Sequence, residues 1–350
     1  MTNLSPDTRA LTGVDDLLAA GLAPADQAGD LAAVAQDFQI RITPAMRHAI
    51  TAPGDGVAAQ FVPDPRELTV QDDELTDPIG DDAHSPVPGL THRYPDRVIL
   101  HVTRSCAVYC RFCFRREVVG ETGPLPDADL DAALAYIAAH PAITEVILTG
   151  GDPLTLSARR LNALLARLDG IAHVGVIRFH TRIPAVAPDR ITPALIDALR
   201  DLRAMPVVVL HINHAAELTP PARAALARLA DGGVMLLSQS VLLRGVNADA
   251  DTLAALFRAL IRNRVKPYYL HHCDRARGTS HFRTSIAEGQ AIMAALRGRI
   301  SGICLPTYVL DLPGGHGKVP IGPNEAVETT PGIWEIRDWQ GHPHRYDEGV

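Results

Sequence analysis

Short apolar runs rich in β-branched residues alternate with segments of helical periodicity along most of the chain. The runs that predict strands are Val98–Val102, Glu145–Leu148, Val174–Phe179, Val207–Ile212, Val234–Leu237 and Pro267–Leu270. The segments that predict helices are Asp127–Ala139, Ser157–Leu168, Pro193–Leu202, Pro220–Ala230, Ala250–Arg262 and Ser285–Leu296. Strands and helices that alternate in this way form a parallel sheet with right-handed crossovers. The sequence therefore predicts an α/β fold built from six strand–helix units.

Six units are too few for the closed eight-stranded barrel, so they fit an open or partial (βα)6 barrel, with a doubly wound sheet as the alternative. In both folds, ligands bind where the parallel strands end. The segments that follow the predicted strands are polar or reactive: the cysteine-containing loop 103–116, Gly150–Pro153, His180–Arg182, His211–His214, Ser238–Ser240 and His271–Asp274. Such a concentration at one end predicts the position of the functional site.

The two ends of the chain follow other patterns. Residues 1–90 begin with three short helical patterns, Val14–Leu22, Asp30–Phe38 and Thr43–Thr51. A polar, acidic stretch then runs from residue 64 to 88; apolar anchors such as Leu68 favour an ordered arm over a disordered linker. Residues 91–300 are predicted to form the barrel and residues 301–350 a short C-terminal segment with strand-like pieces.

Composition narrows the class of protein. The chain has 350 residues, 47% of them hydrophobic, which is enough for a substantial core. Its net charge of −7 argues against non-specific binding to nucleic acid. The N-terminus lacks a basic region followed by an apolar run, and no apolar run approaches the roughly 18 residues of a membrane span. With five cysteines and no disulfide framework, a reducing cytoplasm is the expected location.

Three of those cysteines form the most informative motif. Cys106, Cys110 and Cys113 have the spacing C-x3-C-x2-C, and the aromatic Phe112 precedes the third. Clustered thiolates suit a soft metal centre, and three ligands leave one iron of a [4Fe–4S] cluster open for chemistry. A zinc knuckle, a thioredoxin-like C-x-x-C or a buried group of free thiols are the alternatives, and each leaves part of the motif unexplained.

A second reactive candidate lies near the C-terminus. Lys318 follows Gly314, Gly315 and Gly317 and precedes the segment Val319-Pro320. This is not a phosphate-binding Walker A loop, because the spacing of the glycines and the residue after the lysine are wrong for it. A surface lysine on a flexible turn is the ordinary interpretation, and a lysine that forms a Schiff base with pyridoxal phosphate (PLP) is the more specific one.

Long motifs connect these features. The cysteine spacing, with Gly150-Gly151-Asp152-Pro153 after the next strand, resembles the radical S-adenosylmethionine (SAM) enzymes. Further segments resemble the lysine 2,3-aminomutase family over roughly residues 60 to 330: Ser85–Arg97, Cys106–Arg116, Leu148–Leu154, Gln239–Asn247, Cys273–Asp274, His281–Thr284 and Asp311–Pro320. That family combines radical SAM chemistry with PLP on a partial (βα)6 barrel.

The resemblance implies a role for each matching residue. Cys106, Cys110 and Cys113 would hold the [4Fe–4S] cluster, and Lys318 would bind PLP covalently. The residues implied to surround SAM are Phe112, Gly150, Gly151, Asp152, His211 and Gln239. Those implied to help bind PLP are Arg93, Tyr94 and Arg97. Those implied to bind substrate are Arg115 on the carboxylate and Asp274 and Asp311 on the distal ammonium of lysine.

The resemblance also implies an activity and partners. The expected reaction is migration of the amino group of L-lysine from Cα to Cβ, which gives β-lysine. A reductase, flavodoxin or ferredoxin would supply electrons, a homo-oligomer is compatible with the family, and neither nucleic acid nor membrane is an expected partner. The structural zinc of the family's larger members is not expected, because Ala248 and Asp249 follow Asn247 and no cysteine occurs after Cys304. Alternatives are a different amino acid substrate, modification of elongation factor P, and a non-catalytic iron–sulfur protein.

Overall fold

A nine-stranded sheet forms the body of the computed structural model, which describes residues 9–120 and 123–349. Its strands occur in the order of the sequence: β1 (Leu90–Tyr94), β2 (Arg97–Thr103), β3 (Glu145–Gly150), β4 (Val176–Thr181), β5 (Met205–His211), β6 (Met235–Val241), β7 (Lys266–His271), β8 (Thr307–Leu312) and β9 (Gly317–Pro320). Strands β2 to β8 are parallel, while β1 and β9 pair antiparallel at the two edges. The order does not reverse at any switch point, so the sheet is a nearly closed barrel and not a doubly wound sheet.

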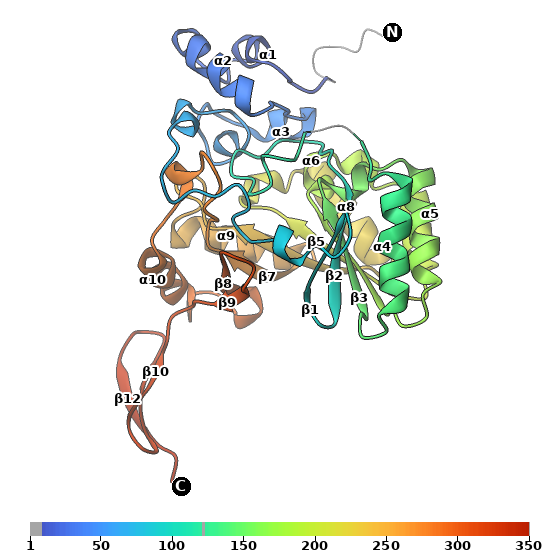
Figure 1. Ribbon diagram of the computed structural model, residues 1–350. Helices are drawn as coiled ribbons and strands as arrows, with labels where there is room; N and C mark the ends of the chain where they lie inside the picture. The colour runs from blue at the N-terminus through green and yellow to red at the C-terminus, as the bar shows by residue number, and fades with distance from the viewer. Residues whose placement is uncertain (1–8, 121–122, 350) are drawn as a thin grey trace.

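Helices connect the parallel strands and cover the outside of the barrel (Figure 1). They are α4 (Asp127–Ala139), α5 (Ala158–Asp169), α6 (Ile183–Val186), α7 (Pro193–Arg200), α8 (Pro220–Asp231), α9 (Ala250–Arg262) and α10 (Ile286–Leu296). Helix α9 illustrates why they form. Asp249 caps its N-terminus by accepting a hydrogen bond from the amide of Thr252, and Leu253, Leu256 and Leu260 bury one face. The six predicted strand–helix units are therefore confirmed, and the edge strand β1 is an addition that the sequence pattern did not predict.

Alternation along the strands separates the outer core from the interior of the barrel. On β2, Val98, Leu100 and Val102 are buried, whereas Ile99 and His101 line cavities inside the barrel. Polar side chains fill part of the interior, where the guanidinium of Arg178 meets the carboxylate of Glu145 at 2.8 Å. Because Glu145 is the first residue of β3, this pair lies toward the amino ends of the strands, opposite the carboxyl ends at which ligands bind.

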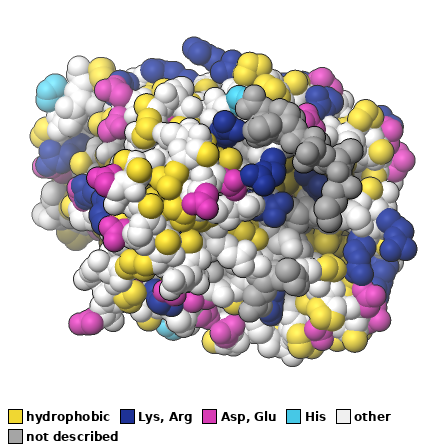
Figure 2. Space-filling view, turned by 90° about the horizontal axis from the view of Figure 1, so that it is seen from above, with side chains coloured by type: hydrophobic (Ala, Val, Ile, Leu, Met, Phe, Trp, Pro, Cys, Tyr) yellow, Lys and Arg dark blue, Asp and Glu magenta, His cyan; other side chains and the backbone are white. Residues whose placement is uncertain are grey.

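The N-terminal arm covers the barrel at the carboxyl ends of the parallel strands (Figure 1). It contains α1 (Val14–Ala19), α2 (Ala28–Asp37) and α3 (Pro44–Ala49), followed by short 3-10 turns that include Pro65–Leu68 and Asp82–His84. The face seen from above in Figure 2 carries cationic and anionic side chains intermixed with apolar ones. The arm is ordered, as predicted, but only some of the predicted anchors are buried: Phe61 is in the core, whereas Leu68 and Val70 are exposed.

A three-stranded antiparallel sheet lies beyond the barrel. Its strands are β10 (Ala326–Thr330), β11 (Ile333–Arg337) and β12 (Pro343–Asp347), and it projects from the body in Figure 1. The strand predicted near 332–336 is therefore present. No helix in the described ranges has the length and apolar character needed to cross a membrane.

Candidate active site

One cavity at the carboxyl ends of the strands gathers most of the predicted site residues. The predicted residues that line it are Cys106, Cys110, Phe112, Cys113, Arg115, Gly150, Gly151, Asp152, His211, Gln239, Asp274, Asp311 and Lys318. Arg93, Tyr94 and Arg97 are not among its lining residues. The three cysteines and Lys318, separated by about two hundred residues of sequence, thus face a common space. We refer to it as the central cavity.

The glycine pair brings the cysteine loop against the end of β3. A Cβ on Gly150 would lie 2.4 Å from the carbonyl oxygen of Thr103, and one on Gly151 would lie 2.2 Å from that of Ser105. Gly150 also has φ +112, which L side chains rarely adopt. The amide of Asp152 donates to Ser105 O at 2.9 Å. The glycines are therefore required by the close approach of the cysteine loop itself, in addition to lining the cavity.

A buried ion cluster from the N-terminal arm anchors the cysteine loop. The carboxylate of Glu67, which is 0% exposed, accepts hydrogen bonds from Arg111 Nε at 2.9 Å and Arg111 Nη2 at 2.6 Å, and it also contacts Arg116. The Arg111 amide donates to Gln60 O at 2.8 Å. Because Arg111 and Arg116 flank Cys113, the arm holds the third cysteine in place.

The three thiols suit an iron–sulfur cluster better than a single ion. In the described part of the chain, no three His, Cys, Asp or Glu side chains converge to hold one metal ion. A cluster instead uses one thiolate for each ligated iron. Burial raises the pKa of all three thiols, and that of Cys113 rises to about 11 through burial and the proximity of Cys110. The positive charge of a metal centre would reverse this and stabilise the thiolates.

Arg182, a strand-end residue without a predicted role, supports this region. Its Nη1 donates to Cys110 Sγ at 2.8 Å, and its Nη2 bonds Gln60 Oε1 at 2.9 Å and the buried carboxylate of Glu217. Asp152 also bonds this segment. Its carboxylate accepts hydrogen bonds from Thr181 Oγ1 at 2.7 Å and from the Arg182 amide at 2.7 Å. The carboxylate predicted to contact SAM thus also ties the end of β3 to the end of β4.

Three buried histidine nitrogens are available to hydrogen-bond a polar ligand. His180, His211 and His271 line the central cavity, and the Nε2 atom of each is buried with no hydrogen-bond partner among the described residues. Burial lowers the pKa of each imidazole, so the rings are neutral. The ring of His211 lies 5.6 Å from that of Phe112, centroid to centroid. Buried polar atoms in native proteins are normally satisfied, so a bound polar cofactor fits here.

Lys318 lies on β9 beside the two predicted aspartates. Its Nζ contacts Asp311 Oδ1 at 2.7 Å and Oδ2 at 2.9 Å, and His271 Nδ1 lies 3.3 Å from the same carboxylate. Burial alone would raise the pKa of Asp311, but His271 and Lys318 hold it well below its ordinary value. Burial and the nearby Asp311 raise the pKa of Asp274 to about 7. The two carboxylates therefore differ: one already pairs with an ammonium and the other favours the neutral form.

Of the three residues predicted to bind PLP, Tyr94 meets Lys318 from the other edge of the sheet. Tyr94 Oη accepts a hydrogen bond from the Lys318 amide at 2.8 Å, which links β1 to β9. Arg97 pairs with Asp96 at 2.7 Å and lies over the Tyr94 ring at 3.9 Å. Arg93 instead faces the arm, where its Nη2 donates to Ile79 O at 2.7 Å. Tyr94 is therefore placed beside Lys318, and Arg93 is not.

Comparisons with known proteins agree with this geometry. A model of the radical SAM superfamily matches residues 100–254, and a lysine 2,3-aminomutase model matches residues 293–349. The L-lysine 2,3-aminomutase of Acetoanaerobium sticklandii is 44% identical over 298 residues, which are 85% of this chain and 72% of that protein. The chain belongs to the lysine 2,3-aminomutase family.

Other members of this family are similarly close. The L-lysine 2,3-aminomutase of Clostridium subterminale is 42% identical and covers 85% of this chain and 72% of its own length. The corresponding Escherichia coli protein is 40% identical and covers 77% of this chain and 78% of its own length. Among solved structures, a radical SAM methyltransferase from Sphaerobacter thermophilus has a TM-score of 0.45 at 21% identity, covering 63% of this chain and 68% of that chain, which is too distant to support any argument.

As a lysine 2,3-aminomutase family protein with a radical SAM domain, the chain is an enzyme of the isomerase class that acts on a small molecule. The radical SAM domain implies a [4Fe–4S] cluster and SAM. Sequence reasoning overlooked Glu67 and Asp81, which lie in the acidic stretch of the arm and pair with arginines of the cysteine loop. Only the acidic character of that stretch was visible, and it is equally typical of a solvated surface.

Proposed function

We propose that this enzyme converts L-lysine to β-lysine, using a [4Fe–4S] cluster, SAM and PLP. The observation that carries the proposal is the central cavity, which is lined by the cysteine triplet, Lys318, Arg115 and two aspartates. Chemistry between groups held at opposite ends of the sequence requires such a common space.

The contact between Lys318 and Asp311 supports the choice of substrate. The Lys318 side chain ends in the same alkylammonium group as free lysine, and Asp311 binds it through both carboxylate oxygens at 2.7 and 2.9 Å. If Lys318 held PLP covalently, its ammonium would no longer neutralise Asp311. A substrate ammonium could then take its place, with Asp274 beside it. A neutral side chain would leave a buried carboxylate unpaired, which disfavours other amino acids.

Arg115 is suited to bind the opposite end of the substrate. Its side chain lines the central cavity and is 14% exposed, and one of its terminal nitrogens is held by Asp81. A guanidinium has further N–H groups in a planar fork that fits a carboxylate. Arg115 and the aspartate pair would thus fix the two charged ends of lysine and align the carbons between them.

The residues available for the cofactors are those that the resemblance implied. Cys106, Cys110 and Cys113 would hold the cluster, the buried His211 beside Phe112 would face SAM, and Lys318 and Tyr94 would hold PLP. When bound, the cluster and SAM supply a carbon-centred radical and PLP delocalises the unpaired electron of the migrating group. The apolar lining, including Val108, Val186 and Val241, excludes water from that radical.

Two measurements test the proposal. Anaerobic reconstitution followed by absorption spectroscopy should give an iron–sulfur band and a separate PLP band. The reduced holoenzyme should then convert L-lysine, and no other member of a panel of free amino acids, to its β-isomer. A spectrum that lacks the cluster band or the PLP band would reject the proposed set of cofactors, and turnover of another amino acid would replace lysine as substrate.

Modification of elongation factor P would use the same reaction, since an enzyme of that branch would still release β-lysine for transfer to the factor. The zinc-free state, the cytoplasmic location, the electron donor, the oligomeric state and the division into residues 1–90, 91–300 and 301–350 stay predictions of the sequence.

A further inference from the structure

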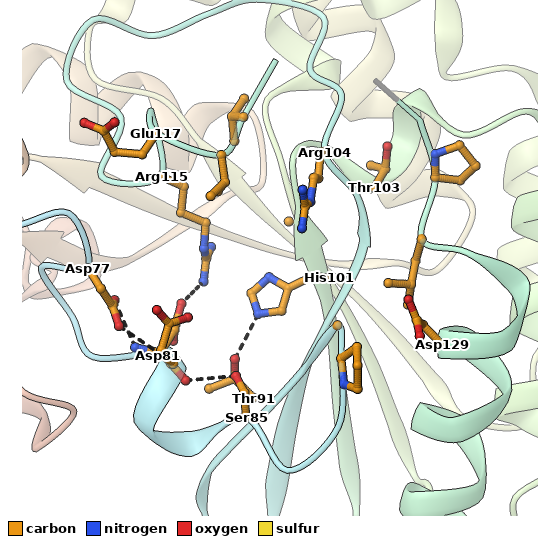
Figure 3. A pocket seen from close by; sticks show the side chains of 18 of the residues that line it. Asp77, Asp81, Ser85, Thr91, His101, Thr103, Arg104, Arg115, Glu117 and Asp129 are labelled. Carbon is orange, nitrogen blue, oxygen red and sulfur yellow. Dashed lines mark hydrogen bonds and ion pairs between the residues drawn. The ribbon is translucent and has the colours of Figure 1, made fainter. Parts of the chain in front are cut away.

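A second cavity adjoins the central one, and Arg115 forms part of the wall between them. This outer cavity has a volume of about 470 Å³ and is lined largely by the arm and by the loop after β2 (Figure 3). Phe114, Arg115, Val119 and Gly150 line both cavities. The orientation of Arg115 therefore decides which space its guanidinium serves.

The arm residue Asp81 holds that guanidinium. Figure 3 shows the Arg115 side chain extended toward Asp81, and Arg115 Nη2 lies 2.5 Å from Asp81 Oδ2. The other oxygen, Oδ1, accepts from Arg93 Nη2 at 3.1 Å. Asp81 and Arg115 are each only 14% exposed, so solvent screens their attraction weakly. Burial would raise the pKa of Asp81, but the charge and hydrogen bond of Arg115 lower it, so the carboxylate is ionised.

The position of Asp81 is itself fixed from two sides. The Asp77 carboxylate accepts hydrogen bonds from the amides of Asp81 and Asp82, both at 3.0 Å. His84 Nε2 lies 3.0 Å from Gly315 O, in the loop that leads into Lys318. A Cβ on Gly80 would lie 2.2 Å from Gly315 N, so the backbones of the two loops touch. Asp81 is thus held by a turn that packs against the loop carrying Lys318.

We infer that Asp81 is a positioning residue for substrate recognition: it orients Arg115 so that the remaining N–H groups of the guanidinium meet the substrate carboxylate. This inference rests on the proposed function. It deepens that function by assigning the binding of the carboxylate end to a pair of residues, one in the barrel loop and one in the arm. Asp81 lines the outer cavity and holds the guanidinium at the wall between the two cavities; without this contact Arg115 has no fixed orientation there, and the substrate must then order it.

The test compares two ligands that differ only in the carboxylate. Equilibrium dialysis of the unreduced holoenzyme measures the affinity for L-lysine and for 1,5-diaminopentane. Diaminopentane has no carboxylate, so the difference between the two affinities reports on the carboxylate end of the substrate. Asp81→Asn should weaken L-lysine binding about tenfold and diaminopentane binding less than about twofold, the usual scale for one charge-assisted contact. Asp81→Glu, which keeps the charge, should restore most of the affinity. The control Asp82→Asn alters an exposed neighbour on the same turn and should leave both affinities unchanged.

Three results for Asp81→Asn would overturn the inference. These are an unchanged affinity for L-lysine, a tighter affinity for L-lysine, and equal weakening of the binding of L-lysine and diaminopentane. Tighter binding would mean that Asp81 competes with the substrate carboxylate for Arg115. If the amide variant does not fold, Asp81→Ser provides the same comparison. Addition of Asp81→Asn to an Arg115→Lys background should have little further effect, because both act through one contact. Failure of the wild-type holoenzyme to bind L-lysine would instead reject the proposed function, so the two failures are distinct.

Discussion

Replacement of Glu67 by Gln should destabilise the protein and release its cluster. Glu67 is 0% exposed, and its partners Arg111 and Arg116 have side chains that are 2% and 5% exposed. The glutamine keeps the shape but leaves two buried guanidinium groups with no anion between them. Removal of one partner from a buried ion pair typically costs about 3–5 kcal/mol. Since a native domain is stable by only about 5–15 kcal/mol, the loss is a large fraction of the total.

Urea unfolding of the cluster-free protein measures this cost. Circular dichroism is the appropriate probe, because neither tryptophan lies in the barrel: Trp334 is on β11 and Trp339 is on the turn between β11 and β12. A matched control is Asp231→Asn, which breaks an exposed pair with Arg264 at 2.7 Å and should cost less than about 1 kcal/mol.

The second readout is iron content after anaerobic reconstitution, which should fall in Glu67→Gln because Cys113 lies between the two arginines. If Glu67→Gln unfolds at the wild-type urea concentration and retains full iron, then the ion cluster does not hold the cysteine loop and this part of the account is incorrect.

Two further substitutions test the seam between β1 and β9, where Tyr94 contacts Lys318, and the aspartate pair Asp274 and Asp311. Gly317→Ala should cost about 1–3 kcal/mol more than Gly233→Ala in urea unfolding. Both glycines have positive φ, but a Cβ on Gly317 would lie 2.6 Å from Tyr94 Oη, whereas a Cβ on Gly233 would meet no described atom within 4 Å. Equal losses would mean that the Tyr94 contact is unimportant. The pKa of Asp274 is raised to about 7, so its contribution to the stability of the cofactor-free protein is present below about pH 4 and is lost as the pH rises through 7. Asp274→Asn should therefore gain stability relative to wild type between pH 5 and 8, and a constant difference across that range would contradict the shift.

The barrel could be predicted because its signal is local. Each parallel strand is a short apolar run, each helix has its own period, and the polar residues follow the strands at one end. The bounds of α4 and α9 agree with the predicted Asp127–Ala139 and Ala250–Arg262. The cysteine triplet and Lys318 could also be singled out as site candidates, since reactive residues in unusual local sequence carry their own signal, and both line the central cavity; their roles stay predictions.

The remaining features depend on tertiary contacts that no local pattern contains. Glu67 and Asp81 are acidic residues in a polar stretch, and their burial becomes apparent only when arginines 44 and 34 residues later fold onto them. The seam between β1 and β9 depends on the close approach of Gly80 to Gly315 and of Tyr94 to Lys318. A glycine in a turn gives no indication of which distant backbone requires it.

The central claim is that the cysteine triplet and Lys318 serve one reaction from two sides of the central cavity. The most direct test of this claim changes each side separately. Lys318→Ala and Lys318→Arg are reconstituted beside Cys113→Ala, and iron content, SAM affinity and β-lysine formation are measured for each. The account predicts that both Lys318 variants keep wild-type iron and SAM affinity but form no β-lysine, while Cys113→Ala loses iron, SAM affinity and product together. β-Lysine formation at the wild-type rate by either Lys318 variant would contradict the account.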